Sequence, residues 1–352
     1  MFRLTRPVVI SLVTAASLAI CGAGAFASSV PSDTPAVAST LPPIDDPATP
    51  DALNEAGERS SQAPYRLEMF MEMSGLGLSI DGAAPLVTGE FANGSSHMVM
   101  DFGAMFASMA DQLPPEMQGA DMTMEMVTQG TDLYLRAPFF AAMAGEAGGA
   151  EGPLGAFAAL GDDWGYIDGT AIPGLSAAQL SGQLGIGGAD PSAFFDMLAN
   201  VEGAEQIGTE DIRGVSTVGV RADVSLADLM AAQGTDTSQI PSAGVDLSTI
   251  TMPIEVWIDK DGFVRRVAME ISPEALATAA ESAAEDLDPN MLGGLEVSMT
   301  MEMFDYDATD IVIEAPTEFV DVTEAFTGLL QPQTASGPDV GADPSAPPTT
   351  IG

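Results

Sequence analysis

The chain has 352 residues and a formal net charge of −41, because only ten basic residues accompany 51 acidic ones. A surface this negative repels phosphate backbones, which excludes nucleic acid as a partner. The chain is nevertheless 46% hydrophobic with a positive mean hydropathy, which excludes an acidic disordered protein and allows a substantial core.

The first 27 residues are typical of a secretory signal peptide. Two arginines precede a short apolar run over residues 8–20, and the small-residue tripeptide Ala-Phe-Ala ends at Ala27. Cleavage at that point predicts an exported protein whose mature chain begins at Ser28. The apolar run is shorter than the roughly 20 residues that a membrane span requires, so we expect membrane association only through a lipid anchor.

The only cysteine, Cys21, stands where a lipoprotein signal would end. A lipobox has a small residue directly before its cysteine, whereas here that residue is Ile20. We therefore favour cleavage after Ala27 and keep lipidation of Cys21 as the alternative. In the favoured case the mature chain contains no cysteine, which excludes disulfides and thiol catalysis.

Composition divides the remaining chain into one domain and two tails. Residues 28–63 and 329–352 are rich in Pro, Ala, Ser, Thr and Asp without periodicity, which predicts a disordered linker and a disordered tail. Residues 64–328 have the size of one large domain, and we expect them to form it.

Alternating apolar and polar residues predict antiparallel strands at the start of this domain. From Tyr65 to Met73 every second residue is apolar, while Arg66, Glu68 and Glu72 point the other way. The same pattern, with glycine-containing turns, predicts the next strands. They are expected at residues 86–91, 96–102, 123–129, 132–136 and 164–167.

The middle of the domain is richer in helix-forming segments. Runs of Ala, Met and Phe predict short helices, and capping residues mark further ones. These helices are expected at residues 102–113, 138–160, 191–200, 225–233 and 272–284. The later strands are expected at residues 206–212, 215–222, 254–259, 263–271, 295–303, 311–313 and 319–320. Strands grouped at both ends with helices between them predict an α+β fold.

The sequence contains no recognisable catalytic motif. His97 is the only histidine, and it lies on a predicted strand without a partner motif. Nucleophile-elbow, zinc-protease and nucleotide-binding signatures are absent from the sequence. The segment Asp259-Lys260-Asp261-Gly262 has its glycine too early for a calcium loop, and a hairpin turn explains it better. We therefore expect no enzyme, no metal site and no cofactor.

The methionines are the most informative residues, because they recur at strand spacing and each set lines one face of a predicted sheet. They could form a packed core, a deformable apolar cavity or a Cu(I) site. The single histidine and the regular alternation make the Cu(I) site the least favoured hypothesis, while the packed core and the cavity are favoured equally. The cavity hypothesis names these candidate ligand-binding residues: Leu67, Met69, Met71, Met98, Met100, Met122, Met124, Met126, Phe139, Phe140, Met143, Phe157, Met299 and Met301.

Residues Val256–Arg266, with the Asp-Lys-Asp-Gly turn at their centre, resemble the strand–turn–strand signature of the LppX/LprG-like branch of the LolA-like envelope proteins. Residues 208–215 resemble that family's preceding hairpin, and 305–323 resemble its ending. The resemblance covers most of residues 64–325. It implies a strongly curved antiparallel half-barrel with helices packed over its concave face, in a protein that binds acyl chains for transfer across the envelope.

The leading hypothesis is therefore an exported, non-enzymatic carrier of lipid or another hydrophobic molecule, acting as a monomer in the cell envelope, at the cell surface or after secretion. The alternative is a ligand-free structural or interaction protein of the cell surface. A Met-rich Cu(I)-binding protein and an enzyme rank lower. The resemblance transfers no site residue, because such a cavity is defined by shape and apolarity.

Overall fold

The computed structural model describes residues 47–75, 78–107, 119–141, 159–171, 203–225, 227, 251–271 and 296–330. Within these ranges the chain is mostly β, with one large and mainly antiparallel sheet and a few short helices. Its strands are β1 (Tyr65–Gly75), β2 (Leu78–Asp81), β3 (Val87–Ala92), β4 (Ser95–Asp101), β5 (Thr123–Gln129), β6 (Asp132–Arg136), β7 (Gly165–Asp168), β8 (Glu205–Ile212), β9 (Val215–Ser225), β10 (Thr251–Asp259), β11 (Val264–Ile271), β12 (Glu296–Phe304) and β13 (Val320–Asp321).

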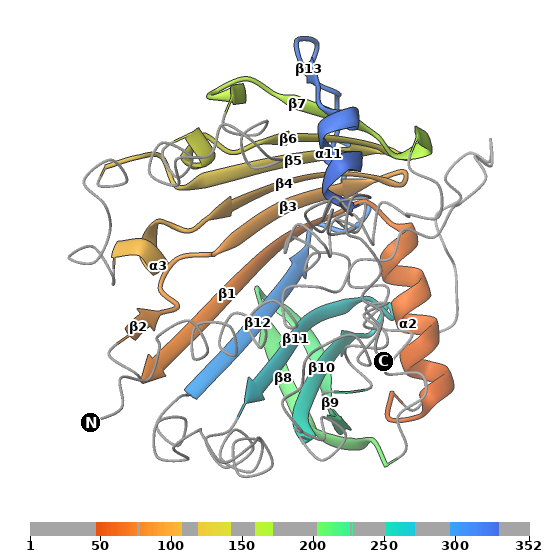
Figure 1. The fold of residues 1–352 in the computed structure, drawn as a ribbon. Coiled ribbons are helices and arrows are strands. Elements are labelled where there is room, and N and C mark those ends of the chain that lie inside the picture. Colours follow the sequence, from red (N-terminus) through yellow and green to blue (C-terminus); the bar gives the residue numbers. More distant parts are fainter. Residues whose placement is uncertain are drawn as a thin grey trace, which may run out of the picture.

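The strands follow the order β13-β7-β6-β5-β4-β3-β1-β12-β11-β10-β9-β8, and β2 pairs with β1 beside this path. Only the β13–β7 pair is parallel among the described strands. The central pair, β1 and β12, joins the beginning of the domain to its end. The two halves of the sheet can therefore pair only after most of the chain has been synthesised. In Figure 1 the sheet runs from β13 at the top to β8 at the bottom.

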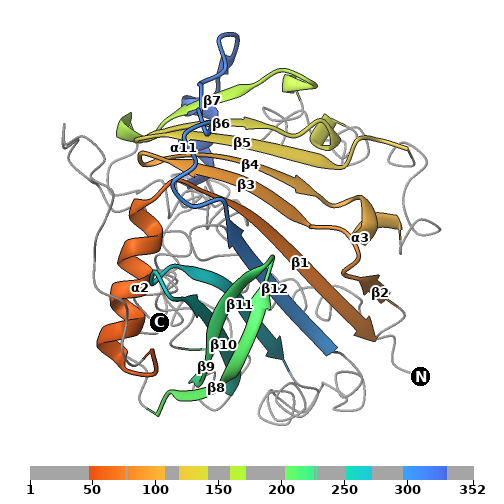
Figure 2. The same cartoon turned by 180° about the vertical axis from the view of Figure 1, so that it is seen from behind.

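The direction of the strands turns steadily across this sheet. Figures 1 and 2 show β3 to β7 running nearly side by side, whereas β9 and β10 cross the view at a steep angle. This rotation is the twist that L-amino acids impose on large sheets. The sheet is not strongly curled, so the half-barrel implied by the family resemblance is replaced by an open, twisted sheet.

Three described α-helices and one 3-10 turn accompany the strands: α2 (Pro50–Gln62), α3 (Gly103–Ala107), η2 (Gly169–Ala171) and α11 (Thr323–Leu330). The prediction of a disordered linker over residues 28–63 was wrong for α2. Thr49 caps that helix by accepting a hydrogen bond from the Ala52 amide at 3.2 Å, and Pro50 occupies its first position. Leu53 and Ala56 are buried in the sheet's core.

The predicted strands agree well with the sheet wherever the alternation is strong. The ranges 123–129 and 132–136 coincide with β5 and β6. Two departures occur where strands are short: β2 was not predicted, and residues 311–313, predicted as a strand, form none. The carbonyl of Ile313 instead accepts a hydrogen bond from the Gln129 side-chain amide at 3.0 Å, so this segment joins the sheet through a side chain.

Tight turns set the register of the hairpins. At the β8–β9 turn Arg213 and Gly214 have φ angles of 51° and 82°, the left-handed pair that a two-residue hairpin loop requires. The predicted helix at 102–113 corresponds in part to α3. Those predicted at 191–200, 225–233 and 272–284 fall outside the described residues almost entirely, and 138–160 is described only at its two ends.

Candidate functional site

Alternate side chains of the central strands form one apolar surface, which we call the methionine face. In β1 it consists of Leu67, Met69, Met71 and Met73, all between 1% and 4% exposed. The strand register places the methionines of neighbouring strands opposite each other, which brings together residues more than 200 positions apart. The facing pairs are Met69–Met301, Met71–Met299, Met98–Met126 and Met100–Met124.

One row of this face runs without interruption across eight strands. Each residue of the row is the direct cross-strand partner of the next, and every member is apolar. In order from β9 to β5 the row consists of Val220, Val256, Val267, Met301, Met69, Val87, Met100 and Met124. Because cross-strand neighbours on one face lie about 5 Å apart, the row is an extended apolar band with flexible thioethers at its centre.

Twelve of the fourteen candidate residues lie within the described chain, and nine of them are on the methionine face. Met122 is buried just before β5. Phe139 is buried with its ring edge-on to Phe102 at 6.0 Å, and the Phe140 ring lies 4.6 Å from the Phe139 ring. Met143, Phe157 and Cys21 lie outside the described residues.

Sequence reasoning missed the part of the methionine face that β9, β10 and β11 supply. Met252, Ile254 and Met269 are at most 5% exposed and belong to the same core. The alternation in residues 254–271 had predicted strands there. It could not show that these strands extend the same face, because that depends on which strands pair.

Two hydroxyl groups interrupt the apolar surface. Ser96 in β4 and Thr128 in β5 are cross-strand partners on the methionine face, and both are fully buried. Their oxygens are 2.7 Å apart, and the Ser96 amide donates a second hydrogen bond to the Thr128 hydroxyl at 3.2 Å. No sequence signal indicated that this pair would be buried, because Ser96 follows another serine at the start of a strand.

The opposite face of the same strands carries paired charges. Glu302 of β12 accepts hydrogen bonds from both Arg213 and Arg266, at 2.8 Å each. Burial works against ionisation of Glu302, but the two guanidinium groups hold its pKa below the ordinary value. Arg66 in turn contacts Glu90, Asp305 and Asp310, and its hydrogen bond lowers the pKa of the Asp310 carboxyl.

Every basic residue outside the first 27 positions is described, and each lies within 4.0 Å of a carboxylate oxygen. These eight residues are Arg59, Arg66, Arg136, Arg213, Arg221, Lys260, Arg265 and Arg266. Five of them take part in pairs on the face opposite the methionines, and the other three lie on α2 or at the β10–β11 turn. The chain after residue 27 therefore offers no unpaired cation to an anionic ligand.

The Asp-Lys-Asp-Gly turn is organised by one buried carboxylate. The Asp259 side chain is fully buried, and its Oδ1 accepts hydrogen bonds from the amides of Asp261 and Phe263 at 2.9 and 3.0 Å. Its Oδ2 accepts a hydrogen bond from Arg265 Nε at 2.6 Å. Gly262 completes the turn with a φ of +81°.

Two distant segments close on this turn. Ser60 of α2 accepts a hydrogen bond from the Val264 amide at 2.9 Å. The Tyr306 hydroxyl donates to the Val264 carbonyl at 2.6 Å, while its ring stacks on Phe263 at 4.4 Å. Burial raises the pKa of the Tyr306 hydroxyl above its ordinary value. The residues that carried the family resemblance thus form a structural junction between α2, the β10–β11 hairpin and the segment that follows β12.

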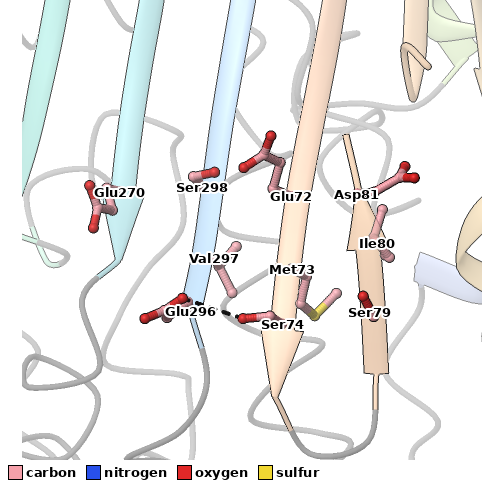
Figure 3. A pocket seen from close by; sticks show the side chains of 10 residues that line it. All are labelled: Glu72, Met73, Ser74, Ser79, Ile80, Asp81, Glu270, Glu296, Val297 and Ser298. Carbon is pink, nitrogen blue, oxygen red and sulfur yellow. Dashed lines mark hydrogen bonds between the residues drawn. The ribbon is translucent and has the colours of Figure 1, made fainter. Parts of the chain in front are cut away.

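A pocket of about 420 Å³ opens beside β2, where β1 and β11 end and β12 begins (Figure 3). Four carboxylates and three serines supply most of its lining, and Ser74 donates to Glu296 across it at 3.4 Å. The lining residues are Glu72, Met73, Ser74, Ser79, Ile80, Asp81, Glu270, Glu296, Val297 and Ser298. None of the fourteen candidate residues is among them, so this polar pocket is not the predicted apolar cavity.

The described ranges contain no group of three His, Cys, Asp or Glu side chains placed to hold a metal ion. Their helices are all too short or too polar to cross a membrane.

Comparison with known proteins gives a likeness of fold only. No protein-family model and no curated protein matches the chain. Among solved structures, LprF from Mycobacterium bovis aligns at 12% identity, 78% of this chain, 99% of that chain and a TM-score of 0.36. Lipoprotein LppX from Mycobacterium tuberculosis aligns at 13% identity over 77% of this chain and 100% of that chain, with a TM-score of 0.38. The MucA/MucB complex from Pseudomonas aeruginosa aligns at 13% identity over 74% of this chain and 59% of that chain, with a TM-score of 0.26. At TM-scores this low the likeness establishes no ligand for this chain.

Proposed function

We propose that the protein is an exported, non-enzymatic carrier that binds lipid or another hydrophobic molecule against the methionine face. The signal peptide supports export, and the family resemblance of the β10–β11 hairpin supports the carrier role. The sequence contains no recognisable catalytic motif that would favour an enzyme instead.

The observation that carries the proposal is the eight-strand apolar row with methionines at its centre. A packed sheet core is normally built from branched residues, whose side chains hold one shape. Methionine has three rotatable bonds and a polarizable sulfur, so it can repack around ligands of different shape. A wide face of such residues can open to an acyl chain at little conformational cost.

Burial of the methionine face is also what a ligand-free structural protein would show, so the ligand itself must be sought. Native mass spectrometry of the protein purified from its own cells, followed by organic extraction, makes the distinction. We expect a stoichiometric adduct that extracts as lipid. A bare mass, together with no uptake of added lipid, would contradict the proposal and favour the structural protein.

The same spectrum also tests the start of the mature chain. Processing after Ala27 gives the mass of a chain that begins at Ser28, which is the expected result. A mass that includes Cys21 with attached acyl chains would instead show a lipid-anchored protein.

Stiffening the centre of the face provides a variant test. The double substitution Met69→Ile/Met301→Ile keeps the site apolar and close to its volume, so the free energy of unfolding should change by less than about 1.5 kcal/mol. Loss of side-chain flexibility should weaken binding of a fluorescent acyl probe by about tenfold. Val99→Ile serves as the control, because Val99 lies between Met98 and Met100 but points to the other face. Equal probe affinity in all three proteins would count against a deformable site.

A further inference from the structure

Ser96 and Thr128 form a polar pair inside an otherwise apolar surface. Their cross-strand neighbours are Phe91 in β3 and Leu133 in β6. Along their own strands the next residues on the same face are Met98 and Met126. β4 and β5 lie side by side in the upper half of the sheet (Figure 1). The pair thus belongs to the proposed binding surface and not to the charged face.

The hydroxyl hydrogens of this pair do not balance. Ser96 and Thr128 each carry one O–H donor, and a single hydrogen bond of 2.7 Å joins the two oxygens. Whichever hydroxyl donates in that bond, the hydrogen of the other has no acceptor among the described residues. Both side chains are fully buried, so bulk water cannot accept the remaining hydroxyl hydrogen. A buried donor without an acceptor costs stability and calls for an explanation.

The charges of the chain restrict what could accept this hydrogen. An anionic headgroup buried near the pair would need a cation to offset its desolvation. All eight basic residues after position 27 already pair with carboxylates, and five of these residues do so on the opposite face of the sheet. A neutral oxygen needs no cation. The carbonyl of an ester is the simplest neutral acceptor that a long-chain apolar molecule carries.

We infer that the Ser96–Thr128 pair donates one hydrogen bond to a neutral ester carbonyl of the bound ligand, and that the site discriminates against anionic lipids. This inference rests on the proposed function and adds the chemical class of the ligand. The hydroxyl pair acts as the polar contact that fixes where along the methionine face the ester lies.

The test compares three ligands delivered from neutral phosphatidylcholine vesicles to the purified protein. Cetyl palmitate carries one ester carbonyl, dihexadecyl ether lacks only that carbonyl oxygen, and palmitate is the anionic probe. We expect the wild-type protein to bind the ester more tightly than palmitate. Replacing both hydroxyls, in Ser96→Ala/Thr128→Val, should weaken ester binding by about 3- to 10-fold while leaving ether binding unchanged, which is the usual range for one neutral hydrogen bond.

The single variants sharpen the assignment. In Ser96→Ala the Thr128 hydroxyl is free to donate to the ligand, and in Thr128→Val the Ser96 hydroxyl is free to do so. Each single variant should therefore keep most of the preference for the ester, and only the double variant should lose it. Thr217→Val is the matched control, because Thr217 is also buried but its hydroxyl donates to the Glu210 carbonyl at 2.7 Å.

The outcomes separate this inference from the proposed function. If the wild-type protein binds none of the three ligands, the carrier function itself fails. If it binds both the ester and the ether, and the double variant weakens both equally or neither, the function stands and the hydroxyl pair is structural. Tighter binding of palmitate than of the ester would also overturn the inference. The comparison of palmitate with the ester uses only the wild-type chain, so it does not depend on the folding of any variant.

Discussion

Met301 and Glu302 are neighbours in β12, yet their side chains lie on opposite faces of the sheet, and different interactions stabilise the two faces. Met301 is 3% exposed and faces Met69 and Val267. Glu302 points to the other side, where Arg213 and Arg266 bind it. One face is stabilised by removing apolar atoms from water, and its side chains are adaptable. The other is held by ion pairs in contact with solvent, each of which contributes little alone.

The difference explains how so acidic a chain can contain an extended apolar surface. All the cations after residue 27 are used to neutralise some of the carboxylates, so none remains to interrupt the methionine face. Among the described acidic residues Asp259 is the one that is buried, and the others are half-buried or exposed, where solvent screens their charge. The described basic residues lie away from the methionine face, which stays apolar apart from Ser96 and Thr128.

The largest expected effect comes from placing a lysine on each of the two faces in separate variants. Met301→Lys buries an ammonium group without a partner, and we expect it to cost about 4 kcal/mol or more of unfolding free energy, or to abolish folding. Thr300→Lys places the same side chain one residue earlier on the charged face, and the expected change is within about 0.5 kcal/mol. Urea denaturation measures both variants. Similar losses in the two would show that the faces do not differ in this way.

A second test asks whether burial alone decides the value of an ion pair. Asp259→Ala leaves Arg265 without its carboxylate partner and removes the oxygen that accepts hydrogen bonds from two backbone amides, so we expect a loss of about 3 to 5 kcal/mol. Asp261, two residues after Asp259, forms an exposed ion pair with Lys260. Asp261→Ala breaks that pair and should cost less than about 1 kcal/mol. Thermal unfolding at neutral pH compares them. An equal shift of Tm in both variants would refute the structural role given to Asp259.

The smallest expected effect concerns Glu302 and pH. Its pKa is lowered in the folded protein, so its pairs stabilise the fold above the ordinary glutamate pKa of 4.5, and this stability is lost as the pH falls through the folded value. Glu302→Gln should cost about 1 kcal/mol at pH 7 and make the stability less dependent on pH in the acid range. Unfolding free energies measured from pH 7 to pH 3 provide the check. A variant with an unchanged acid profile would show that Arg213 and Arg266 do not lower this pKa.

Local pattern predicted the elements with strong alternation and failed where tertiary contacts decide. β5 and β6 were predicted with their correct bounds, because alternation and a glycine turn are local signals. The helix α2 was predicted as linker from its composition, since its apolar stripe is short and counts only when a sheet is present to bury it. Its N-terminal Thr49-Pro50 was the signal that could have revealed it.

From the sequence alone we predicted an export signal, a shortage of lysine and arginine relative to acidic residues, and methionines that lie on one side of each strand. These properties follow from composition and from the two-residue period of a strand. The pairing of β1 with β12, which joins the methionine sets into one face, is visible in the folded structure alone, and so is the burial of Ser96 against Thr128 between β4 and β5. The pairing of strands more than 200 residues apart depends on the free energy of the whole fold, and no local pattern encodes it.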